Sequence, residues 1–350
     1  MSGVSPNPAT HTLSGAPARF PGGLREVAPR TWAWLQPNGG LGESNAGLVV
    51  GDDASLLIDT LWDERLTRRM LDAMAPLLVD APLRRAFITH PDGDHWWGNS
   101  GLPAEAEVVA TAACDHAMRM EALPRVLDGL TRTAGLARRI PRKVGAVAHY
   151  GHAQLAPFAW RDVRLRHADR TIDGGTTLDA GGRAARVLDL GPTHSAADAV
   201  VHLPDVGVVF AGDLLFIGVT PIMWHGPIET WLSALDALVA LDAGVYVPGH
   251  GPPCGRAEIE QLADYWRWLR DGVREQRAAG RSPGEAAREL LRSPEHARWA
   301  RWQNPERIVV SVATAYRNLD GASVELSPPA RARLLVQMWA LGAELAASQS

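Results

Sequence analysis

Four side chains that can hold a metal ion lie close together near position 90. The segment 89–99 reads THPDGDHWWGN, and its candidate ligands are His90, Asp92, Asp94 and His95. A strand that ends in a loop can turn such alternating side chains toward one centre, and Gly93 lets the backbone bend between them. Burying so many polar groups is costly unless a partner such as a metal ion compensates them. The alternative interpretation is a solvated turn, because Pro, Asp and Gly favour turns.

Three more candidate ligands each follow an apolar stretch that has the composition of a strand. They are His194 within GPTHS, Asp213 within AGD and His250 within PGHG. The ends of neighbouring strands meet in space, so these side chains can converge on the first cluster. One such residue alone would be interpreted as an ordinary loop residue. Four clusters in the same setting favour a metal centre.

The order and spacing of these residues resemble the metallo-β-lactamase superfamily, in which a first motif H-x-H-x-D-H is followed by His, Asp and His. The resemblance covers roughly residues 31–255. It implies an α/β fold, an αββα four-layer sandwich, and two divalent metal ions, zinc above all. It also implies that His90, Asp92 and His194 hold the first ion, that Asp94, His95 and His250 hold the second, and that Asp213 bridges both.

One position departs from the family's pattern, because Asp92 stands where most members have a second histidine. A carboxylate is a harder, negatively charged ligand and moves the preference from zinc toward iron or manganese. Diiron members of the family carry a carboxylate at this place, which keeps a diiron oxidase or oxygenase function open. In those relatives the histidine equivalent to His95 can turn away from the metal. His95 is therefore the ligand that the resemblance supports least.

The expected chemistry is hydrolysis by a hydroxide that two divalent ions share, since such ions lower the pKa of a bridging water toward neutrality. The substrate would be a small molecule with an ester, lactone, amide or thioester group. Asp94 and Asp213 are the candidate catalytic residues, and Asp94 could orient the nucleophile or accept its proton. Trp97, Trp224 and His225 are candidates for the substrate pocket. A catalytically silent binding protein of the same fold is the third alternative, and the retained ligand types argue against it.

Short strands alternating with helices must position these side chains. The first half predicts a helix over 62–79, and a helix-rich stretch over 112–143, broken by Pro124 and Pro141, that could lie over the site as a lid. The second half predicts a helix over 229–241. The predicted strands are 31–36, 45–50, 54–59, 84–90, 108–111, 163–167, 184–190, 198–204, 206–213 and 244–250. Two such halves predict two packed sheets with helices on their outer faces.

The composition of the chain changes near both ends. Residues 1–28 are predicted to be a flexible extension, because their beginning is rich in Pro, Gly, Ser and Thr. Residues 29–256 are the predicted catalytic domain. Residues 257–350 are a predicted helical extension, in which Ser282 and Glu285 form a capping box. The apolar faces of these helices need a partner, either the catalytic domain or a second subunit, so a homodimer through them is one expectation.

The composition of this chain of 350 residues argues against several other classes of protein. The formal net charge is −4 and there is no dense Lys/Arg cluster, so a nucleic-acid partner is not expected. No apolar run reaches the roughly 20 residues of a membrane span. Cys114 and Cys254 are far apart, and the first stretch lacks the pattern of a signal peptide. These features predict a cytoplasmic protein without disulfides.

Overall fold

Two β-sheets face each other at the centre of the fold in this computed structural model, which describes residues 9–38, 40–120 and 124–348. The first sheet has the order β1 (Ala9–His11), β2 (Pro17–Ala28), β3 (Thr31–Leu35), β4 (Ala46–Val50), β5 (Ser55–Ile58), β6 (Leu83–Ile88), β7 (Glu107–Thr111), β8 (Arg170–Ile172). The second has the order β13 (Val245–His250), β12 (Val208–Phe216), β11 (Ala199–Leu203), β10 (Ala184–Asp189), β9 (Thr177–Asp179).

The space between the sheets is filled by side chains from alternate positions of their strands. Leu56 and Ile58 of β5 and Val201 and Leu203 of β11 are all buried in one shared cluster. This alternation follows from the pleat of a strand, which points successive side chains to opposite faces. The strands from β5 to β8 pair in parallel, and so do β12 and β13. Parallel strands are covered on both faces, which requires helices outside each sheet.

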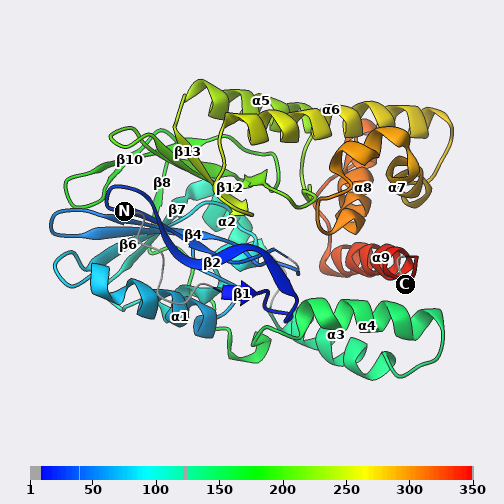
Figure 1. Ribbon diagram of the computed structural model, residues 1–350, viewed down its shortest axis with the longest axis horizontal. Helices are drawn as coiled ribbons and strands as arrows, with labels where there is room; N and C mark the ends of the chain where they lie inside the picture. The colour runs from blue at the N-terminus through cyan, green and yellow to red at the C-terminus, as the bar shows by residue number, and fades with distance from the viewer. Residues whose placement is uncertain (1–8, 39, 121–123, 349–350) are drawn as a thin grey trace.

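Helices cover both outer faces and extend from one end of the sandwich. They are α1 (Glu64–Met74), α2 (Ala112–Met120), α3 (Pro124–Ala137), α4 (Lys143–Leu155), α5 (Ile228–Ala240), α6 (Arg256–Ala278), α7 (Pro283–Arg292), α8 (Ile308–Leu319) and α9 (Pro328–Ala347). Short 3-10 turns are η1 (Ala75–Leu77), η2 (Gly93–His95), η3 (Trp97–Gly101), η4 (Trp160–Asp162), η5 (Pro294–Trp299) and η6 (Pro305–Arg307). In Figure 1, α5 lies above the sheets and α1 below them, so the predicted four-layer sandwich with a C-terminal helical extension is confirmed.

Two helical segments that are far apart in the sequence meet beside the sandwich. The α3–α4 hairpin lies against α9, and α9 also packs on α8 (Figure 1). The ring of Trp339 lies so close to Gly151 of α4 that an added Cβ there would collide with it. Lys143 and Glu344 form an ion pair across the same contact. Helix α9 is thereby fixed to a segment that lies between β7 and β8 of the first sheet.

Two sequence predictions need correction. The flexible extension predicted over residues 1–28 does not hold for residues 9–11 and 17–28, because β1 pairs antiparallel with β2, and β2 pairs with β3 from Gly23 to Ala28. Gly22 has a packing role there, since a Cβ at that position would clash with the carbonyl of Leu35. Residues 1–8 lie outside the described residues. The second correction concerns residues 163–167, which form no strand; instead the side chain of Arg166 donates to the carbonyls of Pro103 and Ala106, just before β7.

In the described parts of the chain, no helix combines the length and apolar character that a bilayer crossing requires.

Candidate metal centre

The predicted ligands come from the ends of strands in both sheets. His90 lies two residues beyond the end of β6, and Asp94 and His95 follow in η2. His250 is the last residue of β13, and Asp213 lies within β12 beside it. The structure brings these residues together with Asp92 and His194, so all seven predicted ligand side chains surround one point.

The four histidines of the cluster are held in the same way. Each places its Nδ1 against an oxygen outside the cluster and turns its Nε2 inward. These outer partners are Thr89 Oγ1 for His90, Asp59 Oδ2 for His95, Ile222 O for His194 and Glu43 O for His250, at 2.9, 2.9, 2.7 and 3.2 Å. Metal-binding histidines are oriented by such outer partners, which fix the tautomer that leaves Nε2 as the ligand atom.

Asp213 lies at the centre of the four inward nitrogens. Its Oδ2 is 3.4 Å from His194 Nε2, 3.3 Å from His250 Nε2 and 3.7 Å from His90 Nε2. Its Oδ1 is 3.2 Å from His95 Nε2. Because its two oxygens face histidines of both candidate ligand groups, this carboxylate is in a position from which it can bridge two ions.

The spacing of the ligand atoms suits metal ions. Among the described residues, three groups each present three atoms within 4.8 Å of one another: His90, Asp92 and His194; Asp94, His95 and His250; and Asp59, His90 and His95. Within them His194 Nε2 lies 3.1 Å from Asp92 Oδ2, and His250 Nε2 lies 3.3 Å from Asp94 Oδ2. Two ligand atoms of one tetrahedral zinc are about 3.3 Å apart, because each lies about 2.0–2.1 Å from the ion.

Unsatisfied polar atoms provide an independent test of this fit. Among the described residues, the buried atoms without a hydrogen-bond partner include His90 Nε2, His95 Nε2 and Asp213 Oδ1. Buried polar atoms are costly to leave unpaired, and metal ions bound to the first two ligand groups would satisfy all three. His95 does not turn away from the centre, since its Nδ1 bonds outward to Asp59 and its Nε2 faces Asp213. The donor set of imidazoles and carboxylates therefore fits divalent transition metals.

In the absence of a metal ion, the pKa values of these side chains depend on the same close contacts between histidines and carboxylates. Burial alone would lower the pKa of His194, but the carboxylates of Asp213 and Asp92 outweigh burial and raise that pKa to about 9. The pKa values of His95 and His250 are also raised against the effect of burial, chiefly by Asp213. Burial would raise the pKa of Asp213, yet the surrounding histidines hold it well below its usual range. Protonated imidazoles thus balance the negative charge of the carboxylates, as bound cations could.

Two buried aspartates that the sequence reasoning missed support the ligands. Asp59 accepts hydrogen bonds from the backbone and hydroxyl of Thr89, both at 2.8 Å, in addition to its contact with His95. Asp198 accepts bonds from the backbone and hydroxyl groups of Thr193 and Ser195, which flank His194. Asp59 directly follows β5, so the strand-end position that identified the ligands was a usable signal for it as well.

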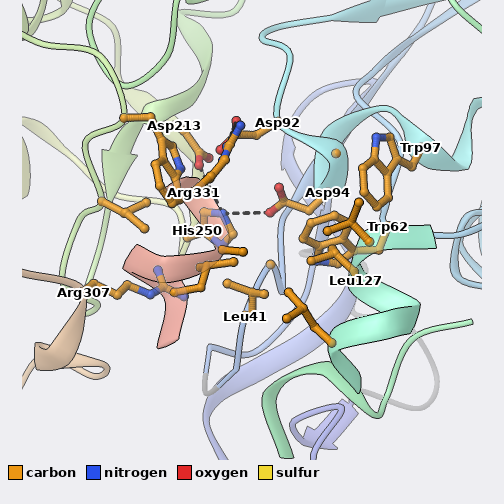
Figure 2. Close-up of a pocket in the computed structure, with 18 of the residues that line it drawn as sticks. Leu41, Trp62, Asp92, Asp94, Trp97, Leu127, Asp213, His250, Arg307 and Arg331 are labelled. Atoms are coloured by element: carbon orange, nitrogen blue, oxygen red, sulfur yellow. Dashed lines mark hydrogen bonds and ion pairs between the residues drawn. The ribbon is translucent and has the colours of Figure 1, made fainter. Parts of the chain in front are cut away.

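The cluster opens into a cavity of about 790 Å³, including its mouth. Figure 2 shows Asp92, Asp94, Asp213 and His250 on one side of this cavity, with Trp62, Trp97 and Leu127 nearby. Helix α3 contributes Val126, Leu127 and Leu130, so the segment expected to lie over the site forms part of its wall. Phe216, Ile222 and Leu335 complete a mainly apolar lining. Such a cavity, with polar groups gathered at one end, suits a small molecule with an apolar body.

The predicted pocket residues take different places. Trp97 and Trp224 line the cavity, and the indole of Trp97 packs edge-on against Trp62 at 5.0 Å. His225 lines a neighbouring hollow that shares Asp92, Trp224 and Arg331 with the cavity, and its Nδ1 lies 3.1 Å from Gly226 O. The reason is local, since the backbone N–H groups of residues 224 and 225 both bond to His194 O, and successive side chains diverge from there.

Two arginines of the C-terminal helices reach the cavity, and no sequence signal pointed to either. Arg331 of α9 donates a hydrogen bond from Nη2 to Asp92 Oδ1 at 3.0 Å. Its guanidinium also stacks on the ring of Trp224, with 4.2 Å from Cζ to the ring centroid. Burial would raise the pKa of Asp92, but Arg331 and His194 hold it well below its usual range. Arg307 of η6 is buried in the wall and donates to Gly40 O at 3.0 Å.

Comparison with known proteins agrees with this architecture. The curated relatives include the 2,4-dinitroanisole O-demethylase subunit alpha of Nocardioides sp. (strain JS1661), 24% identical over 63% of this chain and 56% of the relative. A hydroxyacylglutathione hydrolase of Brucella ovis is 33% identical over 29% of this chain and 39% of the relative. The chain thus spans little more than half of the first relative and about two fifths of the second.

Solved structures share the fold at low sequence identity. The stereoselective inverting sec-alkylsulfatase of Pseudomonas sp. superposes with a TM-score of 0.63 at 18% identity, over 89% of this chain and 53% of that one. A metallo-beta-lactamase family protein of Thermus thermophilus has a TM-score of 0.58 at 20% identity, over 87% of this chain and 98% of that one. A family profile described as the metallo-beta-lactamase superfamily matches residues 39–250. The chain therefore belongs to the metallo-β-lactamase superfamily, whose members bind divalent metal ions and are mostly hydrolases.

Proposed function

We propose that this protein is a dinuclear metal-dependent hydrolase of a small molecule with an apolar body. The observation that supports the proposal most directly is the convergence of four inward Nε2 atoms on Asp213, with Asp92 and Asp94 beside them, at the polar end of an apolar cavity. His90, Asp92 and His194 would hold one ion, Asp94, His95 and His250 the other, and Asp213 both. When bound, two such ions supply Lewis acidity and a water that is acidic at neutral pH.

The protein's own side chains would supply proton transfer and substrate positioning. Asp94 lines the cavity and has its Oδ2 3.3 Å from His250, so its carboxylate is placed to take a proton from the attacking water. Trp62, Trp97 and Leu127 would hold the apolar part of the substrate and exclude water from the reacting group. An ester, lactone, amide or thioester group fits this chemistry.

The names of the relatives widen the set of bonds to test. They include an O-demethylase subunit, a hydroxyacylglutathione hydrolase and a sec-alkylsulfatase. The panel should therefore contain aryl methyl ethers, thioesters and secondary alkyl sulfates as well as esters, lactones and amides. We expect turnover of at least one class that is lost on chelation and restored by a divalent ion. Asp94→Asn should lower kcat by about 10²–10⁴-fold if the carboxylate transfers a proton.

Asp92 keeps one alternative open, a diiron oxidase or oxygenase, since a carboxylate ligand favours iron or manganese over zinc. Zinc is the metal that we propose first, because His95 points its Nε2 into the centre and completes a nitrogen-rich donor set. Protein loaded with zinc and protein loaded with iron(II) should be compared on the same panel. Oxygen consumption by the iron form, with no hydrolysis by the zinc form, would favour the alternative.

A further inference from the structure

We propose that Arg331 is a positioning residue of the metal centre, and that the Asp92–Arg331 pair replaces the neutral histidine usual at this place. The inference rests on the proposed function, because it requires Asp92 to be a metal ligand. It assigns a part of the centre to α9, which lies outside the matched family region of residues 39–250.

The two carboxylate oxygens of Asp92 face different partners. Oδ2 is 3.1 Å from His194 Nε2, inside the first group of candidate ligands. Oδ1 accepts the hydrogen bond from Arg331 Nη2 at 3.0 Å. A carboxylate that is free to rotate can present either oxygen or both to an ion. The guanidinium removes that freedom and leaves Oδ2 directed at the site of the first ion.

The position of Arg331 is itself fixed from two sides. Its guanidinium stacks on Trp224, and the backbone N–H of Trp224 donates to His194 O at 2.8 Å. The ring that supports Arg331 is therefore anchored to the backbone of another candidate ligand. In the chain, Arg331 lies in the first turn of α9, where its backbone N–H bonds to Ser327 O at 3.0 Å. Stacking and in-plane hydrogen bonding together require a planar guanidinium, which lysine does not provide.

The net charge of the Asp92–Arg331 pair also supports the proposal. Histidine at this position would bind a metal as a neutral ligand, whereas Asp92 adds a negative charge. Arg331 returns the charge of the pair to zero without occupying the ligand atom Oδ2. The side chains of Asp92 and Arg331 are only 14% and 24% exposed, so water screens their interaction less than at an open surface. The Asp92–Arg331 pair therefore carries the same net charge, zero, as a single neutral histidine would.

A double-mutant cycle on metal affinity tests the proposal without substrate. Arg331→Met should weaken binding of one of the two ions by about 10–100-fold, and Arg331→Lys by less, while the other ion is retained. In an Asp92→His background, Arg331→Met should cost nothing or improve affinity, because the neutral imidazole needs no counter-charge. The exposed Arg333→Met, on the same helix, is the matched control and should leave both affinities unchanged.

Stepwise titration of the metal-free variants with zinc, against a chelating indicator, gives both affinities directly. If the unaltered protein binds two ions and Arg331→Met changes neither affinity, the positioning role is overturned. The proposed function would then still stand. The same loss for Arg331→Met in both backgrounds would overturn the replacement of histidine by the pair. Failure of the unaltered protein to bind any ion would overturn the proposed function and this inference with it.

Discussion

At the scale of single residues, the centre depends on groups that hold the ligands as much as on the ligands. Asp59 illustrates this, because one carboxylate fixes the ring of His95 and both donors of Thr89. Its backbone lies in the left-handed region at φ 62°, where Asn and Asp are tolerated better than larger residues. The aspartate therefore suits both the backbone and the hydrogen bonds of this position.

Replacing Asp59 should weaken metal binding without removing any ligand. We expect Asp59→Asn to lower the affinity by about 10-fold and Asp59→Ala by about 10–100-fold, because the ring of His95 loses its outer partner. Chelator competition measures this, with the exposed Asp53→Asn as control. An unchanged affinity in Asp59→Ala would show that His95 is not held by this contact or is not a ligand.

Metal affinity should depend steeply on pH. The pKa of His194 is raised to about 9 in the metal-free protein, so at pH 7 the ring carries a proton that an ion must displace. The affinity should therefore rise with pH between about 6 and 9 and fall as the solution is acidified. Calorimetry at pH 7.5 in buffers of different ionisation enthalpy should record protons released on binding. Binding with no proton release would contradict this assignment.

At the scale of elements, the ligands are predictable because they follow strands, and their supports are less so. The strand-end positions of His90, His194 and His250 could be predicted from apolar runs followed by small residues. Arg331 could not, because its contact with Asp92 arises only when α9 folds back against the end of the sandwich that carries the cavity. Composition also misled at the N-terminus, where Gly22 permits close approach of β2 to β3 and does not indicate flexibility. Residues 163–167 alternate like a strand, yet Arg166 bonds to loop carbonyls near β7.

The close pairing of β12 and β13 provides a test at this scale. A Cβ added to Gly249 would collide with the carboxylate of Asp213 and with the backbone of Gly212. Gly249→Ala should therefore displace Asp213, abolish tight binding of both ions and lower the free energy of unfolding by about 1–3 kcal/mol. Gly244→Ala is the control, since the nearest atom to its Cβ is 3.8 Å away. Retention of both ions by Gly249→Ala would contradict the central position of Asp213.

At the scale of the whole molecule, the helices after β13 pack against other helices and also supply a side chain to the cavity. One face of α9 lies against α4 and α8, and its first turn carries Arg331 to the cavity. Val336 on the same helix remains 42% exposed. The homodimer through the C-terminal helices stays a prediction. In sedimentation, the unaltered protein should have a dimer mass and Val336→Asp a monomer mass. The neighbouring exposed Gln337→Asp should keep the dimer mass. A monomeric unaltered protein would contradict the prediction.

We expect one cluster of seven side chains, drawn from both sheets, to bind two ions around Asp213. Elemental analysis of the metal-loaded protein after removal of free ions tests it most directly, with Asp213→Ala compared alongside. We predict two zinc ions per chain in the unaltered protein and a clear loss in Asp213→Ala, since its carboxylate is shared by both ion sites. An equal metal content in the two proteins, or none in either after loading with zinc, manganese or iron(II), would show that the cluster does not hold two ions around Asp213.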